Sequence, residues 1–212
     1  FDVLLRNSAK IRLLCGNLIT NLFSTSCRDA VVNIYKNDTC IFAGFIEPQT
    51  LSQPYNNRWD ELELNCIDAL SALQYSKYKN VGALGVIYAF VKAEAAQRSF
   101  YDIATEILQG VTEGLDILGN QNIKFWYDGS KAVDAQTANR YQVLRQLSIS
   151  DLLFLGDDES DVWQQDEVLE ELLKYLNLHI VQDGFNFYIF SWESVKATPD
   201  KIIWHDIVAN ST

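Results

Sequence analysis

Apolar and polar residues alternate with a period of two through much of the first third of the chain. Within residues 61–67, apolar side chains at 62, 64 and 66 alternate with two glutamates and an asparagine, which predicts a strand with one buried face. Residues 30–35 and 40–46 are β-branched and aromatic runs joined by Lys36-Asn37-Asp38-Thr39, which predicts a hairpin. Residues 1–75 are therefore expected to form a β-rich, barrel-like domain.

Two local features lie at the ends of this domain. Residues 1–6 and 10–15 are short apolar runs that meet at the turn-prone pair Asn7-Ser8. At the other end, the strand at 61–67 runs directly into Asp68, a residue type that suits the N-cap of a helix. Apolar residues follow Asp68 at helical spacing, so we expect a helix to begin directly after this strand.

A helical pattern occupies the middle of the chain. Residues 92–98 are typical of a helix, and Ser99 followed by Asp102 predicts the N-cap of another one. Apolar side chains from Phe100 onward recur on one face of this second helix. Gly110 is expected to end it, because glycine is the usual residue at a helix C-terminus.

A stronger helical pattern covers residues 166–176, where leucines and a valine share one face. Residues 178–192 follow it, with Asp183-Gly184 between two apolar runs, the strongest signal of a short hairpin. The second run is apolar on both faces, so a helix should cover one face and another element or subunit the other. Residues 76–212 are therefore predicted to be an α+β domain, with interleaving of the two domains left open.

The whole chain is accordingly assigned to the α+β class, with barrel-like antiparallel domains and helices packed on the sheets. Its 212 residues include 17 basic and 28 acidic side chains, a formal net charge of −11. Nucleic-acid binding needs clustered Lys and Arg to displace phosphate counterions, and the apolar stretches are far shorter than the roughly 18 residues that cross a bilayer. We expect neither specific nucleic-acid binding nor membrane insertion.

Cysteine and histidine are sparse. The four cysteines are Cys15, Cys27, Cys40 and Cys66, and no two of them have the C-x-x-C spacing. We interpret them as small hydrophobic side chains in a reducing compartment, with two disulfides as the alternative. The two histidines, His179 and His205, are expected in a core or an interface. No cofactor and no zinc site are expected.

The densest acidic cluster is a weak candidate for a metal site. It consists of Asp157, Asp158, Glu159 and Asp161. An EF-hand loop that starts at Asp157 needs glycine at its sixth position and glutamate at its twelfth, where this chain has Val162 and Val168. The cluster is therefore better interpreted as a solvated loop close to a helix N-terminus, where the helix dipole favours negative charge.

Catalytic motifs are missing. The chain has no G-x-S-x-G, no P-loop and no G-x-G-x-x-G, so we expect no catalytic residues and no enzyme. Two other classes stay open. One is a carbohydrate-active enzyme that uses paired carboxylates, with the abundant aromatic side chains stacking on sugar, and the other is a cell-surface binding module.

Several stretches together resemble one family. The hairpin at 30–46, the loop after it with Pro48 and Tyr55, and residues 62–73 resemble the early barrel strands and the strand-Asp-helix step of phage baseplate hub and tail-tip proteins. Residues 147–192 are similar to tail proteins of Bacteroidetes prophages. The chain thus resembles the phage tail hub family over most of residues 28–192.

This resemblance implies a structural role. Hub proteins of this kind form a homotrimeric ring on the tail tube from β-barrel domains that mimic the tube subunit. The implied partners are further copies of the chain, the tail tube and other baseplate or tail-tip proteins. The implied location is the tail of the virion, after synthesis in the bacterial cytoplasm. An acidic surface fits such a ring, because it repels the DNA that passes through the lumen.

Overall fold

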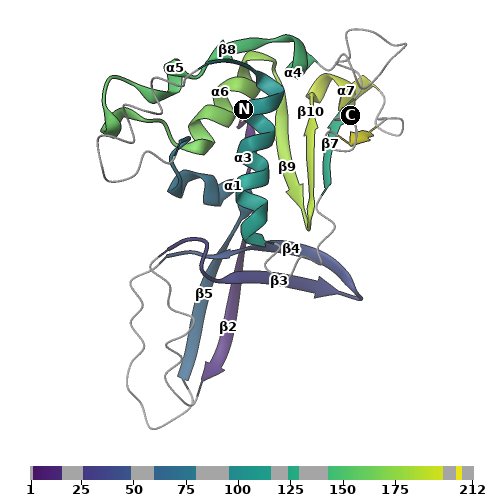
Figure 1. The fold of residues 1–212 in the computed structure, drawn as a ribbon. Helices are drawn as coiled ribbons and strands as arrows, with labels where there is room; N and C mark the ends of the chain where they lie inside the picture. The colour runs from purple at the N-terminus through teal and green to yellow at the C-terminus, as the bar shows by residue number, and fades with distance from the viewer. Residues whose placement is uncertain are drawn as a thin grey trace.

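The computed structural model of the chain describes residues 2–15, 26–48, 60–79, 96–115, 124–128, 143–197 and 204–206. These residues form a mixed α+β fold with antiparallel strand pairing in each sheet, as the sequence predicts, although the β1-β9 and β7-β10 pairs are parallel (Figure 1). The strands are β1 (Leu4–Leu5), β2 (Ser8–Cys15), β3 (Val31–Lys36), β4 (Thr39–Ile46), β5 (Asp60–Asp68), β6 (Gln97–Ser99), β7 (Lys124–Asp128), β8 (Ser148–Ser150), β9 (His179–Asp183), β10 (Asn186–Phe190) and β11 (Trp204–Asp206). The helices are α1 (Ala69–Ala72), α3 (Phe100–Leu115), α4 (Val143–Gln146), α5 (Leu152–Leu155), α6 (Gln165–Tyr175) and α7 (Trp192–Ala197), with 3-10 turns at Leu73–Tyr75 and Glu159–Asp161.

Four strands from the first third of the chain form a curled, half-barrel-like sheet in the order β2-β5-β4-β3, here called the corner sheet. β5 pairs with β2 along its whole length but with β4 only through its last three residues. The ribbon β2-β5, here called the arm, and the hairpin β3-β4 therefore diverge from a shared corner (Figure 1). Gly44 makes this corner possible, because a Cβ there would overlap the carbonyl oxygen of Ile67.

The inner side of the corner sheet is apolar. Leu62, Leu64 and Cys66 are buried, while Glu61 and Glu63 are exposed, so the predicted alternation in β5 is confirmed. The buried residues form a small cluster with Ile46. The corner sheet thus has a core of its own, between its two ribbons.

The predicted hairpin at residues 30–46 is also confirmed. β3 pairs with β4 in antiparallel register, with Lys36 opposite Thr39. The two residues between them, Asn37 and Asp38, have φ values of 49° and 64°. Positive φ at both positions is typical of the type I′ turn, whose twist matches that of the strands.

The second large sheet has the order β1-β9-β10-β7-β11. With the helices packed on it, it forms what is here called the body. The predicted hairpin at 178–192 is present, but its loop is Gly184-Phe185, since Asp183 pairs with Asn186 and Gly184 takes a φ of 54°. The second strand is shorter than predicted, because Trp192 begins α7.

α3 stands upright between α6 and β9 in Figure 1. Its predicted N-cap is confirmed, because the Ser99 hydroxyl accepts a hydrogen bond from the Asp102 amide at 3.0 Å. The prediction that Gly110 ends the helix is wrong, because α3 runs on to Leu115. Val111 and Leu115 are buried, and this burial outweighs the cost of a mid-helix glycine, about 1 kcal/mol.

The prediction of a helix at 92–98 is wrong for those of its residues that the structure describes. Residues 97–99 form β6, which pairs with β8, and the tertiary pairing overrides a weak local propensity. Residues 92–95 of that segment, like the loop at 49–59, lie outside the described residues.

The helix predicted at 166–176 is confirmed as α6, apart from its last residue. Its face of Val168, Leu169, Leu172 and Leu173 is buried, and each of these side chains is at most 2% exposed. Leu176 is half-buried. These residues join Ile180 and Phe187 of the sheet in the main core.

Residues on both sides of the predicted boundary at 75 share this core. Phe45 and Leu70, from the first segment, lie in one buried cluster with Ile103, Leu169 and Phe187 from the second. β1 also belongs to the body sheet, because it pairs in parallel with β9. The run at 1–6 therefore does not form a hairpin with β2, and the chain passes from one sheet to the other at Arg6-Asn7.

Candidate functional site

Asp68 lies where the arm meets the body. Its carboxylate accepts hydrogen bonds from the Asn7 amide at 2.6 Å, the Ser71 amide at 2.8 Å and the Ser71 hydroxyl at 2.7 Å. The predicted N-cap is thus confirmed, and the same carboxylate also holds the start of β2. Burial raises the pKa of Asp68, and the hydrogen bonds from Ser71 and Asn7 offset part of that rise.

Gln182 links the body hairpin to the same place. Its side-chain oxygen accepts from the Ala69 amide at 2.8 Å, and its side-chain nitrogen donates to the carbonyl oxygens of Ala43 and Gly184 at 2.8 and 2.9 Å. The Asn7 side chain donates to the Gln182 carbonyl oxygen at 3.0 Å. This group, Asn7, Asp68, Ser71 and Gln182, is here called the joint, because it ties the corner sheet to the body.

Sequence reasoning identified Asp68 in the joint but missed Gln182. The available signal was a lone amide within the apolar run of β9, at a position that faces the core. A buried amide must satisfy both its donors and its acceptor. Here backbone groups satisfy all of them, two from other segments (Ala69 and Ala43) and one from Gly184 in the same hairpin.

The corner sheet presents unpaired strand edges. Among the described residues, no strand pairs with the outer edge of β2 or with that of β3. Large apolar side chains are exposed on the same two ribbons: Leu14 is 71% exposed, and Tyr35 and Ile41 are each 52% exposed. Unpaired edges beside exposed apolar side chains are typical of surfaces that pair with another chain.

The polar face of the arm carries ion pairs. Lys10 lies 2.7 Å from Glu63, and Arg12 lies 3.3 Å from Glu61 and 3.2 Å from Glu63. The hydrogen bond from Lys10 and its charge lower the pKa of Glu63, with a smaller effect from Arg12. Exposed pairs of this kind add little stability, but they keep one face of the arm polar.

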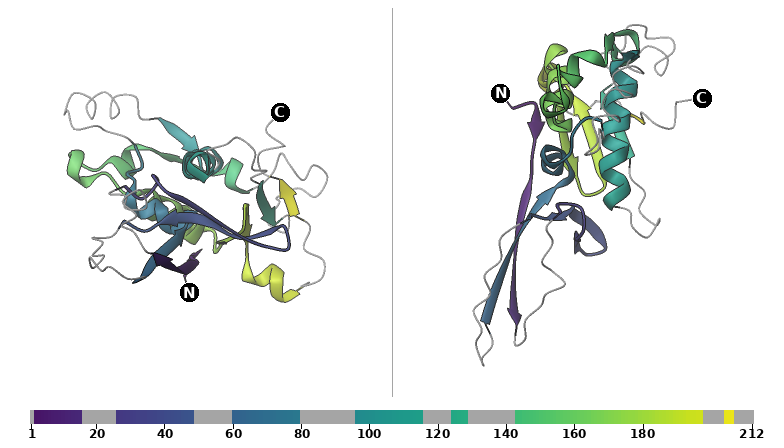
Figure 2. Two further views of the ribbon diagram at one scale, coloured as in Figure 1. Left: turned by 90° about the horizontal axis from the view of Figure 1, so that it is seen from below. Right: turned by 60° about the vertical axis from the view of Figure 1, so that its left-hand side comes forward.

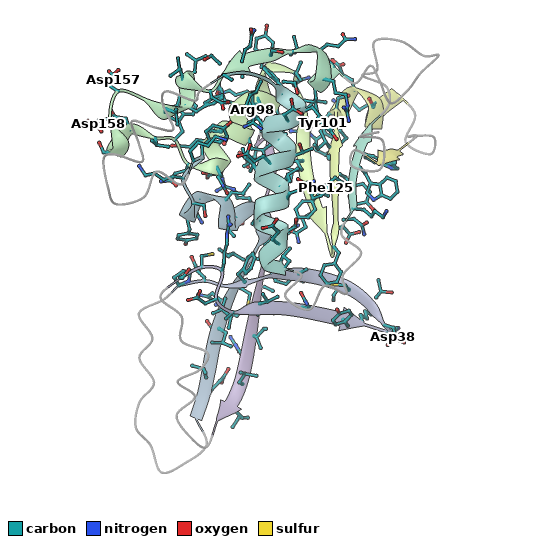
Figure 3. All side chains as sticks on the ribbon, viewed as in Figure 1. Asp38, Arg98, Tyr101, Phe125, Asp157 and Asp158 are labelled. Carbon is teal, nitrogen blue, oxygen red and sulfur yellow. The ribbon has the colours of Figure 1, made fainter. Side chains whose placement is uncertain are left out.

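The candidate metal residues lie elsewhere, on the periphery of the body. Asp157 and Asp158 project outward on the opposite side of the molecule from Asp38, which lies at the tip of the β3-β4 hairpin (Figure 3). Asp157, Asp158 and Asp161 are exposed, and Glu159 opens the 3-10 turn that Asp158 caps through the Ser160 amide at 2.8 Å. Within the described part of the chain, no three or more His, Cys, Asp or Glu side chains could hold a metal ion.

The thiols that the structure describes are free. Cys27 and Cys66 are buried, and Cys40 is half-buried. Burial raises the pKa of Cys27 to about 11 and also raises the pKa of Cys66. These thiols therefore stay protonated at neutral pH and are poor nucleophiles.

His179 is a core residue, one of the two environments expected for it. It is 4% exposed, and its Nδ1 lies 2.9 Å from the carbonyl oxygen of Asp2. Its ring packs beside those of Phe190 and Trp192, at centroid distances of 6.1 and 5.8 Å. The side chains of Cys15 and His205 lie outside what the structure describes.

A second polar network braces α3. Arg98 donates to the Tyr78 hydroxyl at 3.2 Å and pairs with Glu106, and Tyr78 donates to Asp151 at 2.9 Å. Lys79 pairs with Glu106 at 2.8 Å. Burial and then Asp151 raise the pKa of Tyr78, so its hydroxyl stays a hydrogen-bond donor. This network holds four chain segments together.

No family model, curated protein or solved structure matches this chain. In the described residues, no helix is both long enough and apolar enough to cross a membrane. The functional proposal therefore depends on the geometry of the joint and on the exposed edges and side chains of the corner sheet.

Proposed function

We propose that this chain is a structural component of a phage or prophage tail, a baseplate hub or tail-tip protein. It acts without a catalytic centre, by assembling with copies of itself, as a homotrimer in the tail, and by docking to the tail tube and other tail proteins. The observation that carries this proposal is the corner sheet, with exposed apolar side chains on both ribbons and two edges that no strand of the described residues pairs with.

The edges explain how assembly would proceed. β2 and β3 are the two different ends of one curled sheet, so the edge of one subunit can pair with the opposite edge of the next. Such head-to-tail contacts close into a ring when the rotation per subunit fits. The net charge of −11 supports the same role, because an acidic ring does not hold the DNA that passes through it.

The first test is the solution mass of the chain. We expect a trimer by multi-angle light scattering, and we expect Leu14→Lys and Tyr35→Lys to give monomers, because each places a charge on a ribbon edge. Leu153→Lys is the matched control, since Leu153 is 61% exposed but lies on α5 in the body. Equal masses for all three variants would contradict assembly through the corner sheet.

The second test concerns the tail itself. The genes beside this one should encode tail tube and baseplate proteins, and antibodies against the chain should label the tail end of purified particles. A monomer with glycan-hydrolysing or glycan-binding activity and no tail genes beside it would favour the carbohydrate-active enzyme or the cell-surface binding module instead.

A further inference from the structure

The body carries a groove of about 590 Å³ between the turn at 159–161 and the start of α6. Its walls come from three segments: the turn at 159–161, the extended residues 162–164 with Lys77 beside them, and the first turns of α6. The lining residues used below are Lys77, Trp163, Asp161, Glu167, Glu170 and Glu171.

Backbone hydrogen bonds preform this groove. The Trp163 amide donates to the Phe154 carbonyl oxygen at 3.0 Å, and the Trp163 carbonyl oxygen accepts from the Tyr78 amide at 2.8 Å. The Gln164 amide donates to the Glu167 carboxylate at 2.8 Å, which begins α6 with a capping box. A ligand therefore binds to a preformed groove, which reduces the entropy cost of binding.

The charge of the groove determines which ligands it can bind. Four carboxylates line the groove against one ammonium group, that of Lys77. The Lys77 ammonium group already donates to the Ser160 carbonyl oxygen at 2.9 Å, and the exposed Lys174 ammonium group lies 3.7 Å from Glu171 and offsets only that carboxylate in part. The remaining field is negative, so it attracts cations and repels nucleic acid.

Trp163 adds an aromatic surface. It is half-buried, and its ring meets Phe154 edge to face at a centroid distance of 5.5 Å. A tryptophan face binds Arg and Lys side chains through cation–π attraction and contact with their methylene groups. A simple metal ion would leave this surface unused.

We propose that this groove docks an extended Arg- or Lys-bearing segment of a partner protein. The inference rests on the proposed function in one respect, because an assembly component must contact proteins other than itself. It concerns a surface distinct from the edges of the corner sheet. The basic side chains of the segment pair with Glu170 and Glu171, and one of them lies on Trp163.

The test uses a fluorescein-labelled peptide that alternates Gly with Arg, followed by fluorescence anisotropy on the isolated chain. A peptide of the same length with citrulline in place of Arg is the neutral control. We expect the Arg peptide to bind more tightly than the citrulline peptide, with an affinity that falls as salt rises from 50 to 200 mM, since salt screens such attraction.

Two charge-reversal variants separate the groove from the overall charge. Glu170→Lys/Glu171→Lys changes the groove, whereas Glu61→Lys/Glu113→Lys makes the same change in net charge at exposed positions outside it. We expect at least a tenfold loss of peptide affinity in the first double variant and less than a twofold change in the second. Equal effects of the two, or equal binding of the two peptides, would overturn the proposal.

Folding and assembly are controlled separately. Melting temperatures near that of the unchanged chain show that both double variants fold, and Trp163→Phe tests the aromatic contact with the smaller expected loss of about threefold. Peptide binding is measured on single chains, so it can fail while the trimer forms, and it can succeed while the trimer does not form. Failure of the docking proposal can therefore be distinguished from failure of the proposed assembly.

Discussion

The body and the corner sheet bury their apolar residues in different ways. In the body, side chains of α1, α3 and α6 enclose the inner face of the five-stranded sheet in one continuous core. The corner sheet has a smaller cluster around Leu64 and leaves Leu14, Tyr35 and Ile41 exposed. Figure 2 shows the arm extending well beyond the helices. The body thus encloses its main core within one chain, although Leu153 and Tyr175 on its helices are exposed. The corner sheet differs in that its exposed apolar side chains lie beside two strand edges that no described residue pairs with.

The largest expected effect tests the body. Leu172 is 2% exposed on the inner face of α6, so Leu172→Ala should lower the free energy of unfolding by about 2–5 kcal/mol, from lost burial and a residual cavity. Urea unfolding followed by circular dichroism measures it. Leu14→Ala, on the arm, is the control and should change it by less than about 0.5 kcal/mol. A Leu172→Ala loss no larger than that of the control would refute the enclosed core.

The next effect tests the corner. Gly44→Ala should cost about 3 kcal/mol or lose the β4-β5 pairing altogether, because the new Cβ overlaps the Ile67 carbonyl oxygen and the backbone must move. Hydrogen exchange should then show faster exchange in β3 and β4 than in α3. Unchanged exchange in these two strands would mean that the strands do not cross as closely as described.

The joint should give a smaller, pH-dependent effect. Asp68→Asn should cost about 1–3 kcal/mol at neutral pH, because an amide cannot accept all three of the present hydrogen bonds. The raised pKa of Asp68 means that the folded chain binds this proton more tightly than the unfolded chain. The contribution of Asp68 to stability is therefore greatest at low pH and falls as pH rises from the ordinary Asp pKa through the raised value.

Urea unfolding at a series of pH values measures this contribution. The fall in stability over that interval should be shallower in Asp68→Asn than in the unchanged chain. A Ser71→Ala variant, which keeps the carboxyl group, should retain the pH-dependent fall. Parallel curves for the unchanged chain and Asp68→Asn would contradict the assignment.

The smallest effect is a gain. Gly110 lies in the middle of α3, and a Cβ there would meet no atom within 4 Å. Gly110→Ala should therefore raise the free energy of unfolding by about 1 kcal/mol, through helix propensity. Differential scanning calorimetry should show a higher melting temperature. Gly110→Ala in the body and Gly44→Ala in the corner sheet are thus the same substitution with opposite expected effects on the free energy of unfolding.

Local patterns predicted the local structure well. The alternation before Asp68, the N-caps at Asp68 and Ser99, and the two hairpins all depend on neighbouring residues, and all are present. Three predictions were wrong: the helix end at Gly110, the helix at 92–98 and the strand that continues to Trp192. They have a common cause, because each was inferred from local preference alone. Burial of Val111 and Leu115 and the pairing of β6 with β8 decided the first two cases from a distance.

The functional features were harder to predict. Asp68 was identified as a cap, but its link to Asn7 spans 61 residues, and the role of Gln182 depends on contacts between segments more than one hundred residues apart. The acidic cluster at 157–161 was visible in the sequence. The groove beside it was not, because Lys77 and Trp163 come together only through tertiary pairing. The contrast between the enclosed core of the body and the edge strands of the corner sheet likewise appears only in three dimensions.

The parallel pairing of β1 with β9 has a consequence for the order of folding. Leu4 lies beside Ile180, so the first strand of the chain has no place in its sheet until the β9-β10 hairpin exists. Contacts between such distant segments form slowly, and during synthesis β1 must wait for most of the chain to leave the ribosome. Asn7 lies two residues beyond β1, and its side chain ties the start of the arm to Gln182 of the body hairpin. The arm is therefore expected to take its final direction late, so that its open edge becomes competent for pairing only on a body that has already folded.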